Sequence, residues 1–105
     1  MVLTPDIPLY ETAKAAMHGL TRSMARDLGR SGIRVNTLVP GAVVTQRQLD
    51  LWLTQQDLDA IETSQALSGH VMPEDCARLA LFLAADDSAM ISGQDFLVDA
   101  GWAHG

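Results

Sequence analysis

The stretch Ile-Arg-Val-Asn-Thr-Leu-Val-Pro-Gly occupies residues 33–41. Its apolar and β-branched residues predict a short strand over 33–39 that stops at Pro40 and Gly41, because both residues interrupt strands. Apolar residues fall on both faces of this strand, with Asn36 as the polar exception. Two apolar faces are typical of a strand in a buried parallel sheet.

The sequence on either side of this strand alternates between helical and extended patterns. Upstream, apolar residues recur at helical spacing over 9–30 and predict a long helix that two glycines end. Downstream, residues 42–70 are polar, with short helices expected around 46–53 and 55–66. An excursion of this length is more typical of a lid or substrate loop than of a core element. A second helix over 74–85 and a last strand over 95–99 follow.

The order of these elements predicts the fold class. Helix, strand, helix and strand in succession indicate an α/β fold with a parallel sheet. Two strands alone cannot cover both faces of a sheet or satisfy both of its edges. We therefore expect the chain to be the C-terminal half of a Rossmann-like, doubly wound parallel sheet, with the N-terminal half outside these 105 residues.

Composition excludes several classes of protein. The net charge of −6 would repel nucleic-acid phosphates, so we expect no nucleic-acid partner. No apolar run is long enough to span a membrane, and the N-terminus lacks the features of a signal peptide. The single Cys76 fits a reducing compartment. We expect a soluble, cytoplasmic protein with no membrane partner.

The only tyrosine and the only lysine, Tyr10 and Lys14, are four residues apart in the first expected helix. This spacing puts phenol and ammonium on one helical face. At about 4 Å in a partly buried site, the ammonium stabilises a phenolate by about 4 kcal/mol. That interaction would lower the pKa of the phenol toward the range of a general acid or base. Taken alone, the spacing also fits an ordinary surface pair.

Several motifs in order give the chain a resemblance to a known family. They resemble the short-chain dehydrogenase/reductase family in its run of Tyr, three residues, Lys, a long helix, Arg-Val-Asn and Pro-Gly, and in its last turn and strand. The matching residues are Tyr10, Lys14, Arg34-Val35-Asn36, Pro40-Gly41, Thr45, Ser92-Gly93-Gln94 and Val98-Asp99-Ala100-Gly101.

The resemblance implies an NAD- or NADP-dependent oxidoreductase and assigns roles to individual residues. Tyr10 would exchange a proton with an alcohol or carbonyl substrate. Lys14 would lower the pKa of Tyr10 and hydrogen-bond the nicotinamide ribose. The strand-end turn would hold the cofactor through Pro40 and Gly41 beside the nicotinamide, Val43 near its carboxamide and Thr45 toward the phosphates.

Three segments, Thr12-Ala13-Lys14, 45–52 and 82–90, are similar to sugar 1-dehydrogenases of the family, which oxidise aldoses to lactones. This similarity implies a small alcohol, carbonyl or sugar substrate, with the C1 hydroxyl of an aldose as one candidate. The family resemblance also implies a homo-oligomer. Solvated helix faces explain the polar residues of 45–52 equally well.

Other parts of the family pattern are absent. Its glycine-rich phosphate turn, its Asn-Asn-Ala-Gly strand end and its catalytic Ser all precede the Tyr, and only nine residues precede Tyr10 here. Because a glycine-rich turn cradles the pyrophosphate, we expect the isolated chain to be an incomplete and inactive part of the domain.

Two further interpretations remain open. Residues 20–38 superficially mimic a helix-turn-helix DNA-binding motif, although Pro40 and the negative charge oppose it. Alternatively, the small-residue helix serves a non-catalytic fragment that dimerises. No metal site is expected, because the three histidines and the cysteine lack ligand spacing and fit surface or loop positions better: His18, His70, His104 and Cys76.

Overall fold

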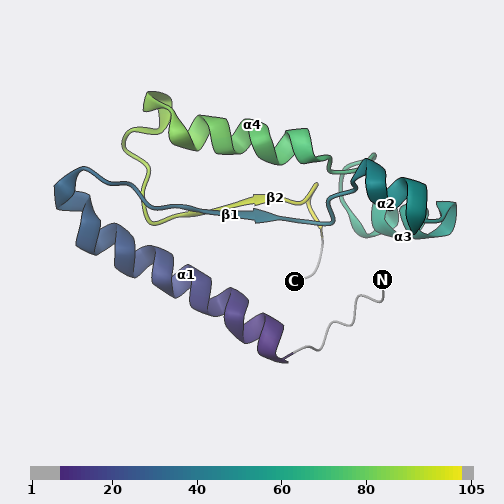
Figure 1. Cartoon of the computed structure of the whole chain (residues 1–105), viewed down its shortest axis with the longest axis horizontal. Helices are drawn as coiled ribbons and strands as arrows, with labels where there is room; N and C mark the ends of the chain where they lie inside the picture. Colours follow the sequence, from purple (N-terminus) through teal and green to yellow (C-terminus); the bar gives the residue numbers. More distant parts are fainter. Residues whose placement is uncertain (1–7, 103–105) are drawn as a thin grey trace. The chain divides into compact units, whose positions relative to one another are not determined.

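The computed structural model describes residues 8–102, with the side chain of Tyr10 outside the description. Figure 1 shows the helices and strands in their order along the chain. Their order and bounds are α1 (Pro8–Leu28), the 3-10 helix η1 (Gly29–Ser31), β1 (Thr37–Pro40), α2 (Gln46–Leu51), α3 (Gln55–Ser64), α4 (Pro73–Ala84), the 3-10 helix η2 (Asp86–Ser88) and β2 (Asp95–Val98).

The two strands pair with each other and run in the same direction (Figure 1). At one end the Thr37 N–H donates to the Gln94 carbonyl oxygen at 2.9 Å, and beyond the other end the Gly41 N–H donates to the Val98 carbonyl oxygen at 2.8 Å. Because both bonds connect residues at the same sequence offset, the strands are parallel. This agrees with the parallel sheet predicted from the sequence.

The first strand differs from its predicted bounds of 33–39. Strand β1 begins only at Thr37 and extends to Pro40. The preceding residues are bonded to a loop instead, since the Val35 N–H donates to the Ser92 Oγ at 3.1 Å and the Val35 carbonyl accepts from the Gly93 N–H at 2.7 Å. Polar groups far along the chain therefore decide where the strand starts.

The helices also differ from prediction at their ends. Helix α1 stops at Leu28 rather than at residue 30, because the chain tightens there into η1 and reverses at Gly32, whose φ is +77°. The expected helices over 46–53 and 55–66 are shorter, as α2 and α3. Each begins with a reciprocal capping box, Thr45 with Gln48 and Thr54 with Asp57. Hydrogen bonds from the Thr54 backbone and side chain lower the pKa of the Asp57 carboxyl.

The chain divides into two compact units, which are described separately. The first contains the residues up to Thr37 together with Leu83–Phe96. The second contains Leu38–Phe82 together with the residues from Leu97 on. The first unit therefore holds α1 and η2, and the second holds α2, α3 and most of α4.

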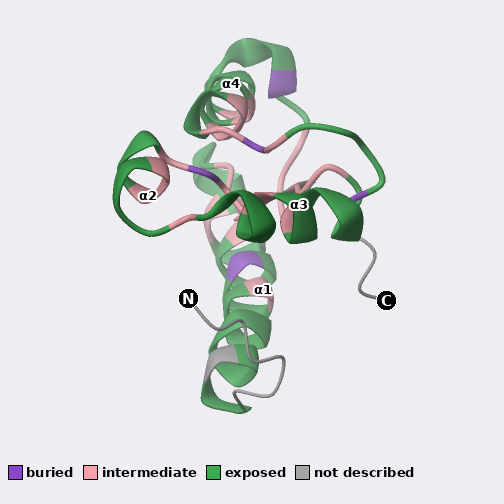
Figure 2. Ribbon diagram, turned by 90° about the vertical axis from the view of Figure 1, so that its right-hand side faces the viewer, coloured by how far each residue is buried: buried purple, intermediate pink, exposed green. Residues whose placement is uncertain are grey.

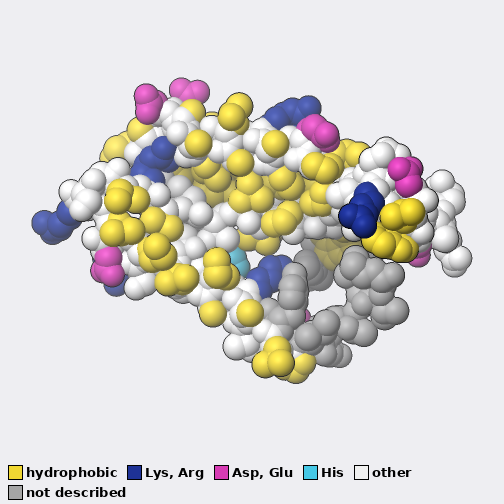
Figure 3. Space-filling view, viewed as in Figure 1, with side chains coloured by type: hydrophobic (Ala, Val, Ile, Leu, Met, Phe, Trp, Pro, Cys, Tyr) yellow, Lys and Arg dark blue, Asp and Glu magenta, His cyan; other side chains and the backbone are white. Residues whose placement is uncertain are grey.

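Few side chains are buried in either unit. Among the described residues the buried hydrophobic ones are Val44 and Val71, both in the second unit, and Figure 2 shows how little of the ribbon is buried. Large apolar side chains stay exposed on both units, including Leu20 at 51% on the first and Leu81 at 74% on the second. Hydrophobic side chains lie open on the face drawn in Figure 3. Such surface is typical of an interaction face.

The described helices are not suited to span a membrane. Among residues 8–102, no helix combines the length and the apolar character that crossing a membrane requires.

Candidate functional site

Tyr10 and Lys14 both lie on α1, four residues apart. The Lys14 side chain is exposed and has no ion pair or hydrogen bond with a described residue. Residues at this spacing are neighbours on a helix surface, with Cβ atoms about 5–6 Å apart. The backbone of α1 thus places the two positions next to each other, and no described side chain competes for the donors of the Lys14 ammonium.

Polar contacts fix α1 within the first unit. Thr21 is buried, donates its hydroxyl to the Met17 carbonyl oxygen at 2.8 Å and also hydrogen-bonds the Thr37 hydroxyl. One turn earlier, His18 Nδ1 lies 2.7 Å from Asp95 Oδ1. The interpretation of His18 as a surface residue is therefore wrong, because this side chain is only 30% exposed and pairs with the first residue of β2.

The four strand-end residues lie together in the second unit. Pro40 ends β1, and Gly41 follows with its N–H on the Val98 carbonyl oxygen. The Val43 N–H donates to the Gly41 carbonyl oxygen at 2.9 Å, and Val43 also forms a parallel bridge with Val71. Thr45 is the N-cap of α2. The loop is thus held in one shape by its own backbone.

Gly41 has a steric role inside this unit. A Cβ at Gly41 would lie 2.7 Å from both Cα and Cβ of Asp99, closer than side chains pack. The close approach of the residue after β2 is therefore sufficient to require glycine here, before any ligand is considered.

We expect Gly41→Ala to destabilise the chain by about 1–3 kcal/mol, because the backbone must shift to relieve the overlap. Gly19→Ala is the matched control: it lies in α1, where an added Cβ would meet no atom within 4 Å, and should stabilise the helix by up to about 1 kcal/mol. Urea denaturation followed by circular dichroism measures both changes. Equal effects of the two substitutions would contradict the steric role.

The predicted site residues fall into two groups. Tyr10 and Lys14 belong to the first unit, whereas Pro40, Gly41, Val43 and Thr45 belong to the second. The structure brings residues together within each group.

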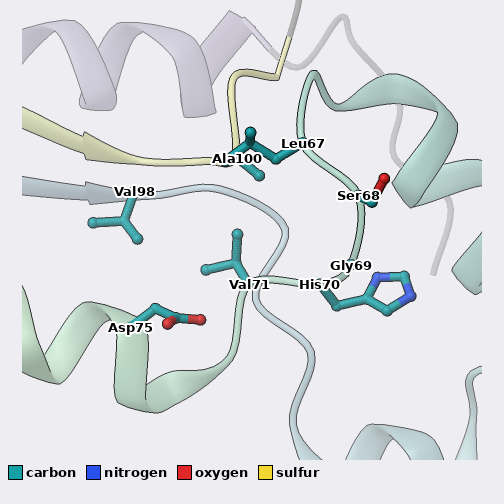
Figure 4. Close-up of a pocket in the computed structure, with 8 residues that line it drawn as sticks. All are labelled: Leu67, Ser68, Gly69, His70, Val71, Asp75, Val98 and Ala100. Atoms are coloured by element: carbon teal, nitrogen blue, oxygen red, sulfur yellow. The ribbon is translucent and has the colours of Figure 1, made fainter.

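The second unit also contains a cavity that the sequence did not indicate. Its volume is about 310 Å³, and its lining includes Val71, Val98 and Ala100 beside the polar His70 and Asp75 (Figure 4). His70 Nε2 lies 3.8 Å from Glu62 Oε2. Asp75 instead caps α4, since its Oδ2 accepts from the Met72 N–H at 2.8 Å. The lining comes from segments about 30 residues apart, so no local motif could indicate it.

Metal-ligating side chains do not gather in the described part of the chain. No group of three or more His, Cys, Asp or Glu residues there is placed to hold a metal ion.

Comparison with known proteins places the chain among dehydrogenases and reductases. Residues 1–103 match the family model described as enoyl-(acyl carrier protein) reductase. The chain is 47% identical over 97 residues to D-xylose 1-dehydrogenase of Caulobacter vibrioides, covering 92% of this chain and 39% of that protein. It is 40% identical over 92 residues to a short-chain dehydrogenase/reductase of Hericium erinaceus, covering 88% of this chain and 36% of that protein.

One solved structure is similar to this chain in both fold and sequence. The structure of 4-hydroxyisoleucine dehydrogenase complexed with NADH and succinate matches with a TM-score of 0.81 and 30% identity, covering 99% of this chain and 42% of that one. The chain therefore spans about two fifths of the length of the proteins that it matches.

Proposed function

From the premise that the chain belongs to the short-chain dehydrogenase/reductase family, a family of NAD(P)-dependent oxidoreductases, we propose that it serves the oxidation of an alcohol, with the C1 hydroxyl of an aldose as substrate. The family resemblance and the α/β fold class predicted from the sequence are confirmed. The observation that carries the proposal is the placement of Tyr10 and Lys14 one turn apart on α1, with the Lys14 ammonium unpaired among described residues. The substrate rests on similarity to a D-xylose 1-dehydrogenase.

In the proposed reaction Tyr10 takes the proton of the substrate hydroxyl. The Lys14 ammonium lowers the pKa of the Tyr10 phenol by favouring its phenolate form. A bound NAD or NADP supplies the hydride acceptor. Lys14 has three N–H donors and no described competitor for them, which suits the hydroxyl groups of a ribose.

The strand-end loop has a donor set that fits the same cofactor. The Thr45 hydroxyl accepts the Gln48 N–H at 3.2 Å, which leaves its own O–H free to donate to a phosphate oxygen. Pro40 and Gly41 lie at the carboxyl end of β1, where ligands of open α/β sheets bind. We propose that Pro40, Gly41, Val43 and Thr45 contact the cofactor.

A chimeric enzyme tests the proposed function. The segment of D-xylose 1-dehydrogenase that aligns with this chain would be replaced by the chain itself. We expect the chimera to reduce NAD or NADP with an aldose as substrate, because the two sequences are 47% identical over that segment. Absence of turnover by a chimera whose circular dichroism matches that of the parent enzyme would refute the proposal.

The isolated 105-residue chain should neither bind NADH or NADPH with micromolar affinity nor turn over substrate. No glycine-rich dinucleotide turn occurs in its sequence, so the usual backbone donors to the pyrophosphate are lacking. Fluorescence titration of the chain with each nucleotide measures this, with the chimera as positive control. A micromolar dissociation constant for the isolated chain would contradict the expectation.

Several finer assignments remain predictions: one partial domain over residues 1–105, a substrate loop over 42–70, homo-oligomer formation and a cytoplasmic location. The exposed side chains of Met17, Leu20 and Met24 on α1 favour the alternative of a dimerising interaction fragment. A sedimentation experiment in which the chain is a monomer would count against this alternative. A helix-turn-helix needs a second helix soon after the first, and the chain instead continues from α1 into η1 and then β1.

A further inference from the structure

The turn that precedes β2 packs closely against α1 within the first unit. This turn is Ser92-Gly93-Gln94. The Gly93 N–H donates to the Val35 carbonyl oxygen at 2.7 Å, and the Ser92 Oγ accepts the Val35 N–H at 3.1 Å. A Cβ at Gly93 would lie 3.4 Å from the Cβ of Ala25 on α1. The backbone of the turn is therefore held in one position beside the helix.

The turn and α1 form the two walls of an open pocket. Its volume is about 540 Å³, and its lining residues are Arg22, Ala25, Arg26, Ser92, Gly93 and Gln94. Volumes of roughly 300–1,000 Å³ are usual for sites that bind small molecules. All of the lining residues belong to the first unit, so both walls are formed within one compact part of the chain.

Two arginines supply the charge of this pocket. Arg22 and Arg26 are one helical turn apart on α1, and both are exposed. Neither has an ion pair or hydrogen bond with a described residue, although the chain has 13 acidic and only seven basic residues. The two nearest carboxylates in the sequence, Asp27 and Asp95, do not line the pocket. Because like charges at this spacing repel each other, an anion between the two guanidinium groups would stabilise them.

The turn adds neutral donors to the two guanidinium groups. The Ser92 Oγ accepts the Val35 N–H, which leaves the hydroxyl hydrogen without a described acceptor. The Gln94 side-chain amide donates to the Ser92 carbonyl oxygen at 3.4 Å, which leaves its second N–H. Each guanidinium has five N–H donors and no acceptor. Such a set of donors suits an oxyanion with several oxygens.

We propose that this pocket binds the phosphate group of a small phosphorylated molecule, with Arg22 and Arg26 as charged contacts and Ser92 and Gln94 as neutral ones. A phosphate monoester has three terminal oxygens and a charge of about −2, whereas a carboxylate has two oxygens and a single charge. The volume of the pocket leaves room for the organic part of the molecule. Arg22 and Arg26 lie about 12 and 18 Å further along α1 than Lys14, so the site goes beyond the proposed function.

Titration of the full 105-residue chain with glycerol phosphate at constant ionic strength tests the site. In nitrogen-15 NMR spectra, the amide signals of Gly93 and Gln94 and the Nε–H signals of Arg22 and Arg26 should shift and saturate. We expect a dissociation constant of about 1 mM, because a few charge-assisted hydrogen bonds form at an open site. Shifts that do not saturate would overturn the proposal.

Other anions separate the possible sources of the charge. Inorganic phosphate should bind with an affinity similar to that of glycerol phosphate, and acetate should bind at least about tenfold more weakly, because it reaches fewer donors. Acetate binding as tightly as glycerol phosphate would contradict a phosphate site. Binding of inorganic phosphate without binding of glycerol phosphate would contradict a site for a phosphorylated molecule.

Substitution of the arginines tests which residues make the contacts. Arg22→Gln and Arg26→Gln should each weaken glycerol phosphate binding about tenfold, because each removes one charge-assisted contact. Both residues are exposed, so the variants should keep the circular dichroism spectrum of the parent chain. Arg30→Gln is the matched control, at an exposed arginine that does not line the pocket, and should leave the affinity nearly unchanged.

Two results with these variants would overturn the proposal. Equal losses in all three variants would show general charge attraction instead of a site, and full affinity in the Arg22 and Arg26 variants would place the anion elsewhere. The titration measures binding alone and needs no turnover. A chimera that is inactive with aldoses therefore removes the proposed function and leaves the phosphate site to be decided by the titration.

Discussion

Tyr10→Phe in the chimeric dehydrogenase is expected to lower kcat by about 10²–10⁴, the usual contribution of a positioned acid or base. The substitution removes one hydroxyl and keeps the ring, so the effect isolates proton transfer. The KM for the aldose should change much less than kcat, because the lost interaction acts in the transition state. Initial rates of NADH or NADPH formation measure both constants.

Lys14 and a neighbouring residue provide the controls for this prediction. Lys14→Met should also reduce kcat strongly and should displace the pH profile upward, because the phenol loses the cation that lowers its pKa. Glu11→Gln, on an exposed residue next to Tyr10, should leave kcat nearly unchanged. If Tyr10→Phe retains most of the parent rate, the assignment of Tyr10 as the proton-transfer residue is wrong.

Arg34→Ala is expected to have the largest effect on stability, a loss of about 2–4 kcal/mol, because it leaves the buried Ser88 and the partly buried Leu83 carbonyl oxygen without their charged donor. The Arg34 Nη1 donates to the Leu83 carbonyl oxygen at 2.9 Å, to the Ser88 carbonyl oxygen at 3.0 Å and to the Ser88 Oγ at 2.9 Å. Its Nη2 donates to the Ala85 carbonyl oxygen at 3.3 Å. Ser88 is fully buried. The guanidinium thus caps the C-terminal end of α4, where a positive charge is favourable.

Urea denaturation of the chain measures this effect. Arg34→Lys should recover only part of the stability, since an ammonium lacks the fork of the guanidinium. Arg30→Gln, at an exposed arginine of η1 with no partner among the described residues, should change stability by less than about 0.5 kcal/mol. Equal losses for Arg34→Ala and Arg30→Gln would contradict the capping role.

Much of the fold followed from local patterns. Helical periodicity located α1 and α4, and strand composition located β1 and β2, because each pattern depends on residues a few positions apart. The ends of the helices and strands depended instead on contacts with residues far away in the sequence. Strand β1 starts at Thr37 rather than residue 33, since Val35 bonds the loop at Ser92 and Gly93.

Local sequence patterns predicted only part of the candidate site. The spacing of Tyr10 and Lys14 is a helical repeat, and α1 places both positions on one face. Nothing near His18 in sequence suggested a partner, because Asp95 is on another element. Gly41 was predicted to shape a cofactor turn, and the structure adds a contact with Asp99 that requires glycine.

The sequence by itself therefore determined the element order, the parallel α/β class, the family and the Tyr10–Lys14 spacing. Only the tertiary structure decided that Arg34 caps α4, that Asp95 lies beside His18 and that Asp99 packs on Gly41. The physical reason is the range of the interactions. Periodicity and turn chemistry act between near neighbours, whereas these contacts join residues about 50 to 80 positions apart and exist only once strands and helices have packed.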